Sequence, residues 1–86
     1  MNNSLQTLAF ELLGRVGADD FDVWMERHAR KLGVDFTIRQ KFPHLVRIEA
    51  TGAKEMVDAF ALACSLGPQS VCIENLVILE AGLPEK

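Results

Sequence analysis

Hydrophobic and polar residues alternate along three stretches of the chain, and a fourth stretch near its end is almost wholly apolar. In the first stretch, Leu8, Phe10 and Leu12 share one face, while Ala9 and Glu11 lie on the other. A period of two residues is typical of strands that bury one face. The predicted strands cover residues 8–16, 34–39, 45–50 and 71–79, and the second and third are joined by a turn at 41–44.

Two intervening segments carry apolar residues at helical spacing instead. The first helix is predicted to begin at Asp19 or Asp20, because a carboxylate can cap the first helical turn. It should end at Gly33, since glycine is common just after a helix. Its apolar stripe consists of Phe21, Trp24, Met25, His28, Ala29 and Leu32.

The second helix is predicted to begin at Thr51 or Gly52 and to end before Gly67 and Pro68. Six consecutive apolar residues, 59–64, leave this helix without a clear polar face. We therefore expect Leu62 and Leu66 to be exposed.

The predicted order is strand, helix, strand, strand, helix, strand. With right-handed crossovers, two such strand-helix-strand units interleave into one antiparallel sheet with both helices on the same face. The fold class is therefore α+β, a ferredoxin-like βαββαβ sandwich. One domain is expected over residues 5–81, with flexible termini at 1–4 and 82–86.

Composition narrows the classes of function. The chain has 86 residues, of which 49% are hydrophobic, and a net charge of −3. Such a charge does not favour nucleic-acid binding. We see no secretion signal or membrane-spanning stretch, so a cytoplasmic location without membrane association is expected. Cys64 and Cys72 should then be reduced, and we expect both to pack as small apolar groups.

The segment from Gly14 to Trp24 carries conflicting chemical signals. A tight loop between a strand and a helix presents backbone N–H groups and the positive end of the helix dipole, as phosphate sites do. Here that position holds Asp19, Asp20 and Asp22, which would repel an anion. These carboxylates fit helix capping better than a divalent-cation site, because the spaced acidic series of a calcium loop is absent. No metal or other cofactor is expected.

The remaining candidate residues have structural interpretations. We expect Trp24 to lie in the core, His28 to be a half-buried packing residue and His44 to belong to a turn. Neither histidine sits in a nucleophile arrangement. On the uncovered face of the sheet, we expect the apolar residues Leu13, Leu45, Cys72 and Leu76 among Glu11 and Arg47. Exposed apolar patches often mark contact surfaces, so a homodimer is a hypothesis and a monomer its alternative.

From Leu12 to Ile78 the chain resembles acylphosphatases, small cytosolic proteins of this architecture. The motifs that carry the resemblance are Gly14-Arg15-Val16, Phe21, the helical run from Arg27 to Gly33, Gly52, Phe60 and Gly67-Pro68. Each motif is weak alone, and their joint order and spacing make the resemblance specific.

The resemblance breaks at the catalytic positions. The family pattern Gly-Arg-Val-Gln-Gly-Val-x-Phe-Arg corresponds to residues 14–22, so the arginine that grips phosphate falls on Asp22. The asparagine that orients the attacking water falls on Gln40. What remains of the family's anion loop is Arg15, Val16, Gly17, Ala18, Asp19, Asp20 and Phe21.

These departures lead to a functional expectation. We expect a domain that has lost hydrolase activity and that binds a small molecule or a protein, or regulates a partner. The alternative is an active acylphosphatase that hydrolyses the carboxyl-phosphate bond of acyl phosphates with altered groups. A third interpretation is a small-molecule-binding or oligomerising module unrelated to phosphate.

Overall fold

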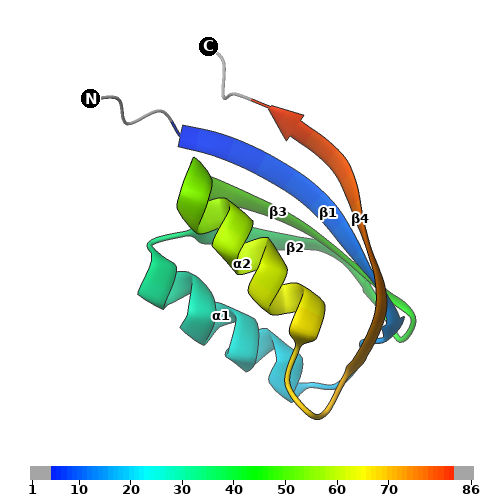
Figure 1. Cartoon of the computed structure of the whole chain (residues 1–86). Helices are drawn as coiled ribbons and strands as arrows, with labels where there is room; N and C mark the ends of the chain where they lie inside the picture. The colour runs from blue at the N-terminus through cyan, green and yellow to red at the C-terminus, as the bar shows by residue number, and fades with distance from the viewer. Residues whose placement is uncertain (1–4, 83–86) are drawn as a thin grey trace.

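Four antiparallel strands form one sheet in the order β2-β3-β1-β4, and two helices cover one of its faces (Figure 1). The computed structural model describes residues 5–82. The strands are β1 (Leu5–Arg15), β2 (Asp35–Phe42), β3 (Leu45–Ala53) and β4 (Cys72–Gly82), and the helices are α1 (Asp20–Leu32) and α2 (Lys54–Leu66). The predicted ferredoxin-like βαββαβ fold is confirmed.

Several boundaries differ from the sequence prediction. The second helix begins at Lys54 rather than at Thr51 or Gly52, because β3 stays paired with β1 as far as Ala53. Strand β2 runs through Phe42, so the turn that follows contains Pro43 and His44 alone. Of the termini expected to be flexible, residues 1–4 and 83–86 lie outside the described residues.

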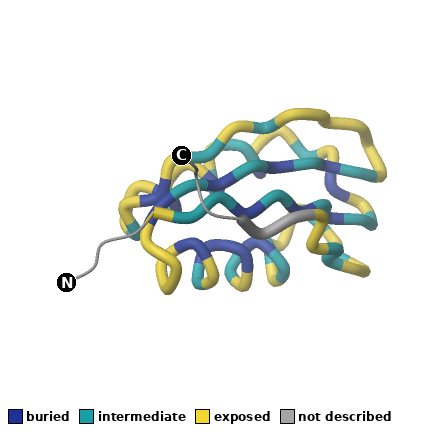
Figure 2. The backbone as a smooth tube through the Cα atoms, turned by 90° about the horizontal axis from the view of Figure 1, so that it is seen from above, coloured by how far each residue is buried: buried dark blue, intermediate teal, exposed yellow. Residues whose placement is uncertain are grey.

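The core lies between the sheet and the helices, and Phe60 of α2 is at its centre. The Phe60 ring is fully buried and meets Phe10 of β1 edge-on, with ring centroids 6.4 Å apart, and Phe36 of β2 at 5.3 Å. Figure 2 shows the buried positions alternating along the central strands. They include Leu8, Phe10, Leu12, Val46, Ile48 and Ala50, on one face of the sheet.

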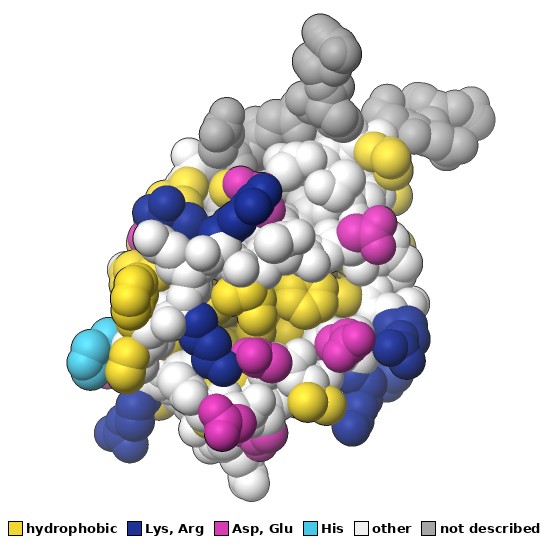
Figure 3. Space-filling model, turned by 180° about the vertical axis from the view of Figure 1, so that it is seen from behind, with side chains coloured by type: hydrophobic (Ala, Val, Ile, Leu, Met, Phe, Trp, Pro, Cys, Tyr) yellow, Lys and Arg dark blue, Asp and Glu magenta, His cyan; other side chains and the backbone are white. Residues whose placement is uncertain are grey.

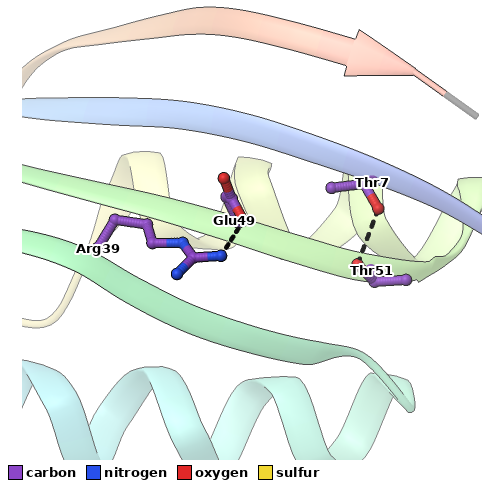
Figure 4. A network of polar contacts seen from close by, with 4 residues as sticks. All are labelled: Thr7, Arg39, Glu49 and Thr51. Atoms are coloured by element: carbon purple, nitrogen blue, oxygen red, sulfur yellow. Dashed lines mark hydrogen bonds and ion pairs between the residues drawn. The ribbon is translucent and has the colours of Figure 1, made fainter. Parts of the chain in front are cut away.

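The opposite face of the sheet is tied together by polar pairs. Glu11 accepts two hydrogen bonds from Arg47 across β1 and β3, at 2.7 and 3.1 Å. Arg39 donates to Glu49 at 2.9 Å, and the hydroxyls of Thr7 and Thr51 lie 2.9 Å apart (Figure 4). This face therefore carries matched polar pairs beside an apolar group formed by Leu13, Leu45 and the exposed Phe42.

Two of the four apolar residues expected on this face differ from prediction. Leu13 and Leu45 lie opposite each other there and are half-buried, as expected. Leu76 was placed wrongly: it pairs with the core residue Leu12 and packs against the core on the helix side. Cys72 is exposed rather than packed as an apolar group, because it begins an edge strand, next to Ile73 that turns inward. Cys64 is buried as predicted.

Replacing Phe60 should expose how much of the stability comes from this aromatic centre. We expect Phe60→Ala to lower the free energy of unfolding by about 3–5 kcal/mol, because the ring is lost and a cavity is left. The matched control is Val23→Ala on α1, where the side chain is 54% exposed and the change should stay within about 0.5 kcal/mol. Urea unfolding measures both, and equal effects would contradict this placement of the core.

The two thiols should differ in reactivity and in their effect on stability. Burial raises the pKa of Cys64 from 9.0 to about 12. A thiol reagent near neutral pH should therefore label Cys72 in the native protein and Cys64 only after unfolding. Above pH 9 the unfolded thiol ionises while the buried one stays protonated, so stability should fall with rising pH more steeply than in Cys64→Ala. Native labelling of both thiols at equal rates would contradict this prediction.

Candidate functional site

The candidate site is the loop of residues 16–19 between β1 and α1. The backbone holds this loop against the β2–β3 turn: Gly14 N donates to His44 O at 3.2 Å, and Val16 N donates to Pro43 O at 3.0 Å. Gly17 lies so close to the turn that an added Cβ would sit 3.1 Å from the Cα of Pro43. The loop is thus fixed by neighbouring backbone and by the side chain of Val16, which is fully buried in the core.

Gly14 makes the end of β1 fit between its neighbours. Its φ of +138° is one that residues with a side chain rarely adopt, and a Cβ there would overlap the carbonyl oxygen of Cys72 in β4. A register shift of the β1–β4 pairing occurs at this point, between Leu13 and Gly14. The close approach of two backbones requires glycine.

The first turn of α1 is not capped as the sequence predicts. Asp19 occupies the N-cap position, but its φ of −65° and ψ of −35° are already helical and its side chain makes no cap hydrogen bond. A capping carboxylate needs a non-helical backbone, typically extended, to reach the amides of the first turn. Within residues 5–82, the amides of Gly17, Ala18 and Asp19 donate to no backbone carbonyl, whereas Phe21 N donates to Ala18 O at 3.2 Å.

Asp22 forms an ion pair with a lysine from β2. Lys41 Nζ lies 2.9 Å from Asp22 Oδ1, and the two side chains are 29% and 46% exposed. Lys41 reaches this position because a bulge between Ile38 and Gln40 shifts the register of β2. Lys41 then pairs with the buried Val46, whose side faces the helices.

Gln40 is directed elsewhere by the same bulge. It lies opposite Arg47, whose side chain is on the uncovered face of the sheet with Glu11, and Gln40 itself is exposed. The structure therefore brings Lys41, not Gln40, to Asp22. Nothing in the alternation of β2 reveals the bulge that turns Lys41 toward the helices.

Asp20 also has a partner from a distant segment. Ser70, in the loop between α2 and β4, donates to Asp20 Oδ1 at 2.7 Å. Two of the three carboxylates at the start of α1 are thus engaged by Lys41 and Ser70, and neither residue was singled out from the sequence. Arg15 is exposed at the end of β1.

These contacts change the electrostatics of the loop. A unit charge 4 Å from Asp22 interacts with it by about 4 kcal/mol at an effective dielectric near 20. Lys41 opposes that repulsion with a charge of equal size, so the loop is less hostile to anions than its sequence indicates. The ion pair itself is partly exposed and contributes only about 0–1 kcal/mol to stability. What the pair does decide is that Lys41 is already neutralised by Asp22.

The aromatic and histidine residues near the loop have packing roles. Phe21 is fully buried, and Trp24 is half-buried against the core with its ring centroid 5.8 Å from that of Phe21. His28 stacks on Trp24 at 4.0 Å, and its Nδ1 lies 3.0 Å from Trp24 O. The half-buried position predicted for His28 is confirmed, and Trp24 lies at the edge of the core rather than inside it.

Residues 5–82 lack both a cluster of potential metal ligands and a membrane-spanning helix. This part of the chain contains no group of three or more histidine, cysteine, aspartate or glutamate residues that could hold a metal ion. It also contains no helix of the length and hydrophobicity needed to cross a membrane.

The fold has clear structural relatives. An acylphosphatase from Bacillus subtilis superposes with a TM-score of 0.78 at 19% identity, covering 91% of this chain and 84% of that one. An acylphosphatase from Coxiella burnetii gives 0.77 at 14% identity, covering 93% and 81%. The chain has the acylphosphatase fold. A structure of full-length HypF, in a phosphate- and nucleotide-bound form, matches at 0.77 and 17% identity over the whole chain, which equals 11% of HypF.

At the level of sequence, no protein-family profile and no curated protein matches the chain. The acylphosphatase fold predicted from short motifs is therefore confirmed in three dimensions, while the resemblance in sequence is confined to those motifs. The β1–α1 loop, on which the family pattern falls, is where this chain departs from that pattern.

Substituting Gly14 should disturb the loop more than substituting another left-handed glycine. Gly33 has a φ of +70° and open space around it, so Gly33→Ala should cost about 1 kcal/mol of backbone strain. Gly14→Ala adds an overlap with Cys72 and should cost about 1–3 kcal/mol more. Thermal or urea unfolding compares the two variants, and a smaller cost at Gly14 would contradict the close approach described here.

Proposed function

We propose that this acylphosphatase-fold domain does not hydrolyse acyl phosphates and serves instead as a binding or regulatory domain. The observation that carries the proposal is the Asp22–Lys41 ion pair at the start of α1. Asp22 stands where the family pattern has its phosphate-gripping arginine. A carboxylate in that place removes the positive charge on which the reaction depends.

The chemistry of phosphoryl transfer supports this proposal. Its transition state spreads negative charge over several oxygens, and enzymes stabilise that charge with fixed cations and N–H donors. In this chain Lys41 is the cation that contacts Asp22, and it is bound to that carboxylate at 2.9 Å. Gln40, at the family's water-orienting position, lies opposite Arg47 on the other face of the sheet. Misplacing a water-orienting group by even about 1 Å costs much of its effect.

A second function is favoured by one specific observation. The loop amides of Gly17, Ala18 and Asp19 have no backbone acceptor within residues 5–82, and Lys41 supplies an ammonium group at Asp22, in the first turn of α1. An active acylphosphatase could use Lys41 as its cation if an incoming phosphate displaced Asp22. We favour the non-catalytic role because this exchange brings the phosphate into repulsion with the released carboxylate.

The kind of partner and the compartment are also part of the proposal. A net charge of −3, with acidic and basic side chains interspersed over the back of the molecule in Figure 3, favours a protein or small-molecule partner over nucleic acid. Two free cysteines, one of them exposed, are typical of a reducing compartment such as the cytoplasm.

Hydrolysis of benzoyl phosphate tests the proposal directly. We expect the purified protein to give no turnover above the rate in buffer, because Asp22 stands in place of the family's phosphate-gripping arginine and holds Lys41 in an ion pair. Asp22→Asn serves as the informative variant, since it frees Lys41 while changing the side-chain shape very little. Asp58→Asn is the matched control, since it releases Lys54 from a similar pair on α2, far along the chain from the loop.

The outcomes separate the two functions. Turnover by the unmodified protein that disappears in Lys41→Met or Gln40→Ala would establish the active enzyme and overturn the proposal. The opposite result is that the unmodified protein shows no turnover and that weak phosphate binding is gained only in Asp22→Asn. That result supports the proposal that the Asp22 carboxylate and its ion pair with Lys41 prevent phosphate binding at the loop.

A further inference from the structure

The two edges of the sheet differ in how they are protected against pairing with another strand. The β2 edge carries Asp35, Arg39 and Lys41, and a bulge interrupts it between Ile38 and Gln40. Charges and bulges on an edge strand discourage pairing with a second chain. The β2 edge is therefore protected along its length.

The β4 edge has neither charged residues nor a bulge over its central part. Residues 75–79, with the sequence Asn-Leu-Val-Ile-Leu, contain no charge and no proline. From Asn75 to Ile78 the strand pairs with β1 in regular register, and the bulges lie on either side of that segment. Since β4 is the last strand of the sheet, the backbone groups on its outer side have no partner strand within residues 5–82.

An apolar groove runs beside this edge, between β4 and α2. It has a volume of about 450 Å³, and its lining includes Leu8, Ala61, Leu62, Leu76 and Ile78. Leu62 is 66% exposed and Ile78 is 49% exposed. Figure 1 shows β4 curving along the outer edge of the sheet beside α2. An unprotected strand edge and an exposed apolar surface thus occur together.

We propose that a second copy of this chain covers this edge, with the two β4 strands paired antiparallel about a two-fold axis near Ile78. Antiparallel pairing of a strand with its own copy is self-complementary, as a two-fold interface requires. A second copy brings an equally uncharged edge and an equal groove, so both apolar surfaces are buried together.

Charge is consistent with this arrangement. Asp58, the charged residue of the groove, is already paired with Lys54 at 2.8 Å and needs no cation from a partner. With the axis near Ile78, the two copies of Glu74 lie at opposite ends of the paired segment and do not face each other. Ile78 pairs with the core residue Phe10, so it faces the helix side, where it meets its symmetry mate beside Leu62.

Sedimentation equilibrium over a wide range of concentration tests the proposal. We expect the mass to approach twice the 9.5 kDa of one chain as concentration rises. Leu62→Lys should raise the dissociation constant at least tenfold, because it places a charge in the groove. Val23→Lys is the matched control, since Val23 is similarly exposed but lies on α1, and it should leave the constant unchanged.

A second variant and a second measurement address the strand edge itself. Ile78→Lys should also abolish dimerisation, and its circular dichroism shows whether it still folds. If Ile78→Lys unfolds, the effect of Leu62→Lys on the dissociation constant decides whether this edge is the interface. In hydrogen exchange of the unmodified protein, the β4 amides that do not bond to β1 should become protected as concentration rises.

Three results would overturn the proposal. The first is a monomer at the highest concentration. The second is an equal effect of Leu62→Lys and Val23→Lys on association. The third is a mass that grows past two chains, which would indicate open pairing of β4 with the β2 edge of another copy rather than a closed dimer.

Discussion

The close approach of β1 to β4 at Gly14 positions the loop of residues 16–19 and the start of α1. Because a glycine with a φ of +138° lets the strand end pass the carbonyl of Cys72, the following loop reaches the β2–β3 turn and bonds to Pro43 and His44 through its backbone. The start of α1 is then placed between two segments distant in sequence. One supplies Lys41 and the other supplies Ser70.

At this site, the charge of the side chains rather than the path of the backbone distinguishes the chain from the acylphosphatase sequence pattern. The strand-loop-helix junction presents amides that have no backbone acceptor within residues 5–82, and such a junction is the geometry that binds oxyanions in other proteins. In the first turn of α1, Asp22 forms an ion pair with Lys41. Such a pair adds little to stability, so its main consequence is electrostatic: it neutralises the cation that an anionic ligand would need.

The sequence predicted the fold well because three signals agree on the same six elements. They are the alternation of apolar and polar residues in the strands, the helical spacing of apolar residues, and the glycines that follow the two helices. It placed Phe10 and Leu12 on the buried face of the first strand and exposed Leu62 and Leu66, and the structure confirms each. It misjudged Leu76, Cys72 and the start of α2, because strand pairing and register decide those positions. The site was less predictable, since a bulge in β2 exchanges the roles of Gln40 and Lys41, and no local pattern encodes it.

The central proposal is that the Asp22 carboxylate, which also holds Lys41 in an ion pair, disfavours anion binding at the loop. A phosphate titration followed through backbone amide shifts tests it most directly. With ionic strength held constant by chloride, we predict no saturable shifts in the amides of residues 16–22 as phosphate rises through the millimolar range. Saturable shifts confined to those amides would contradict the claim, because they would show a phosphate held by the loop despite the carboxylate.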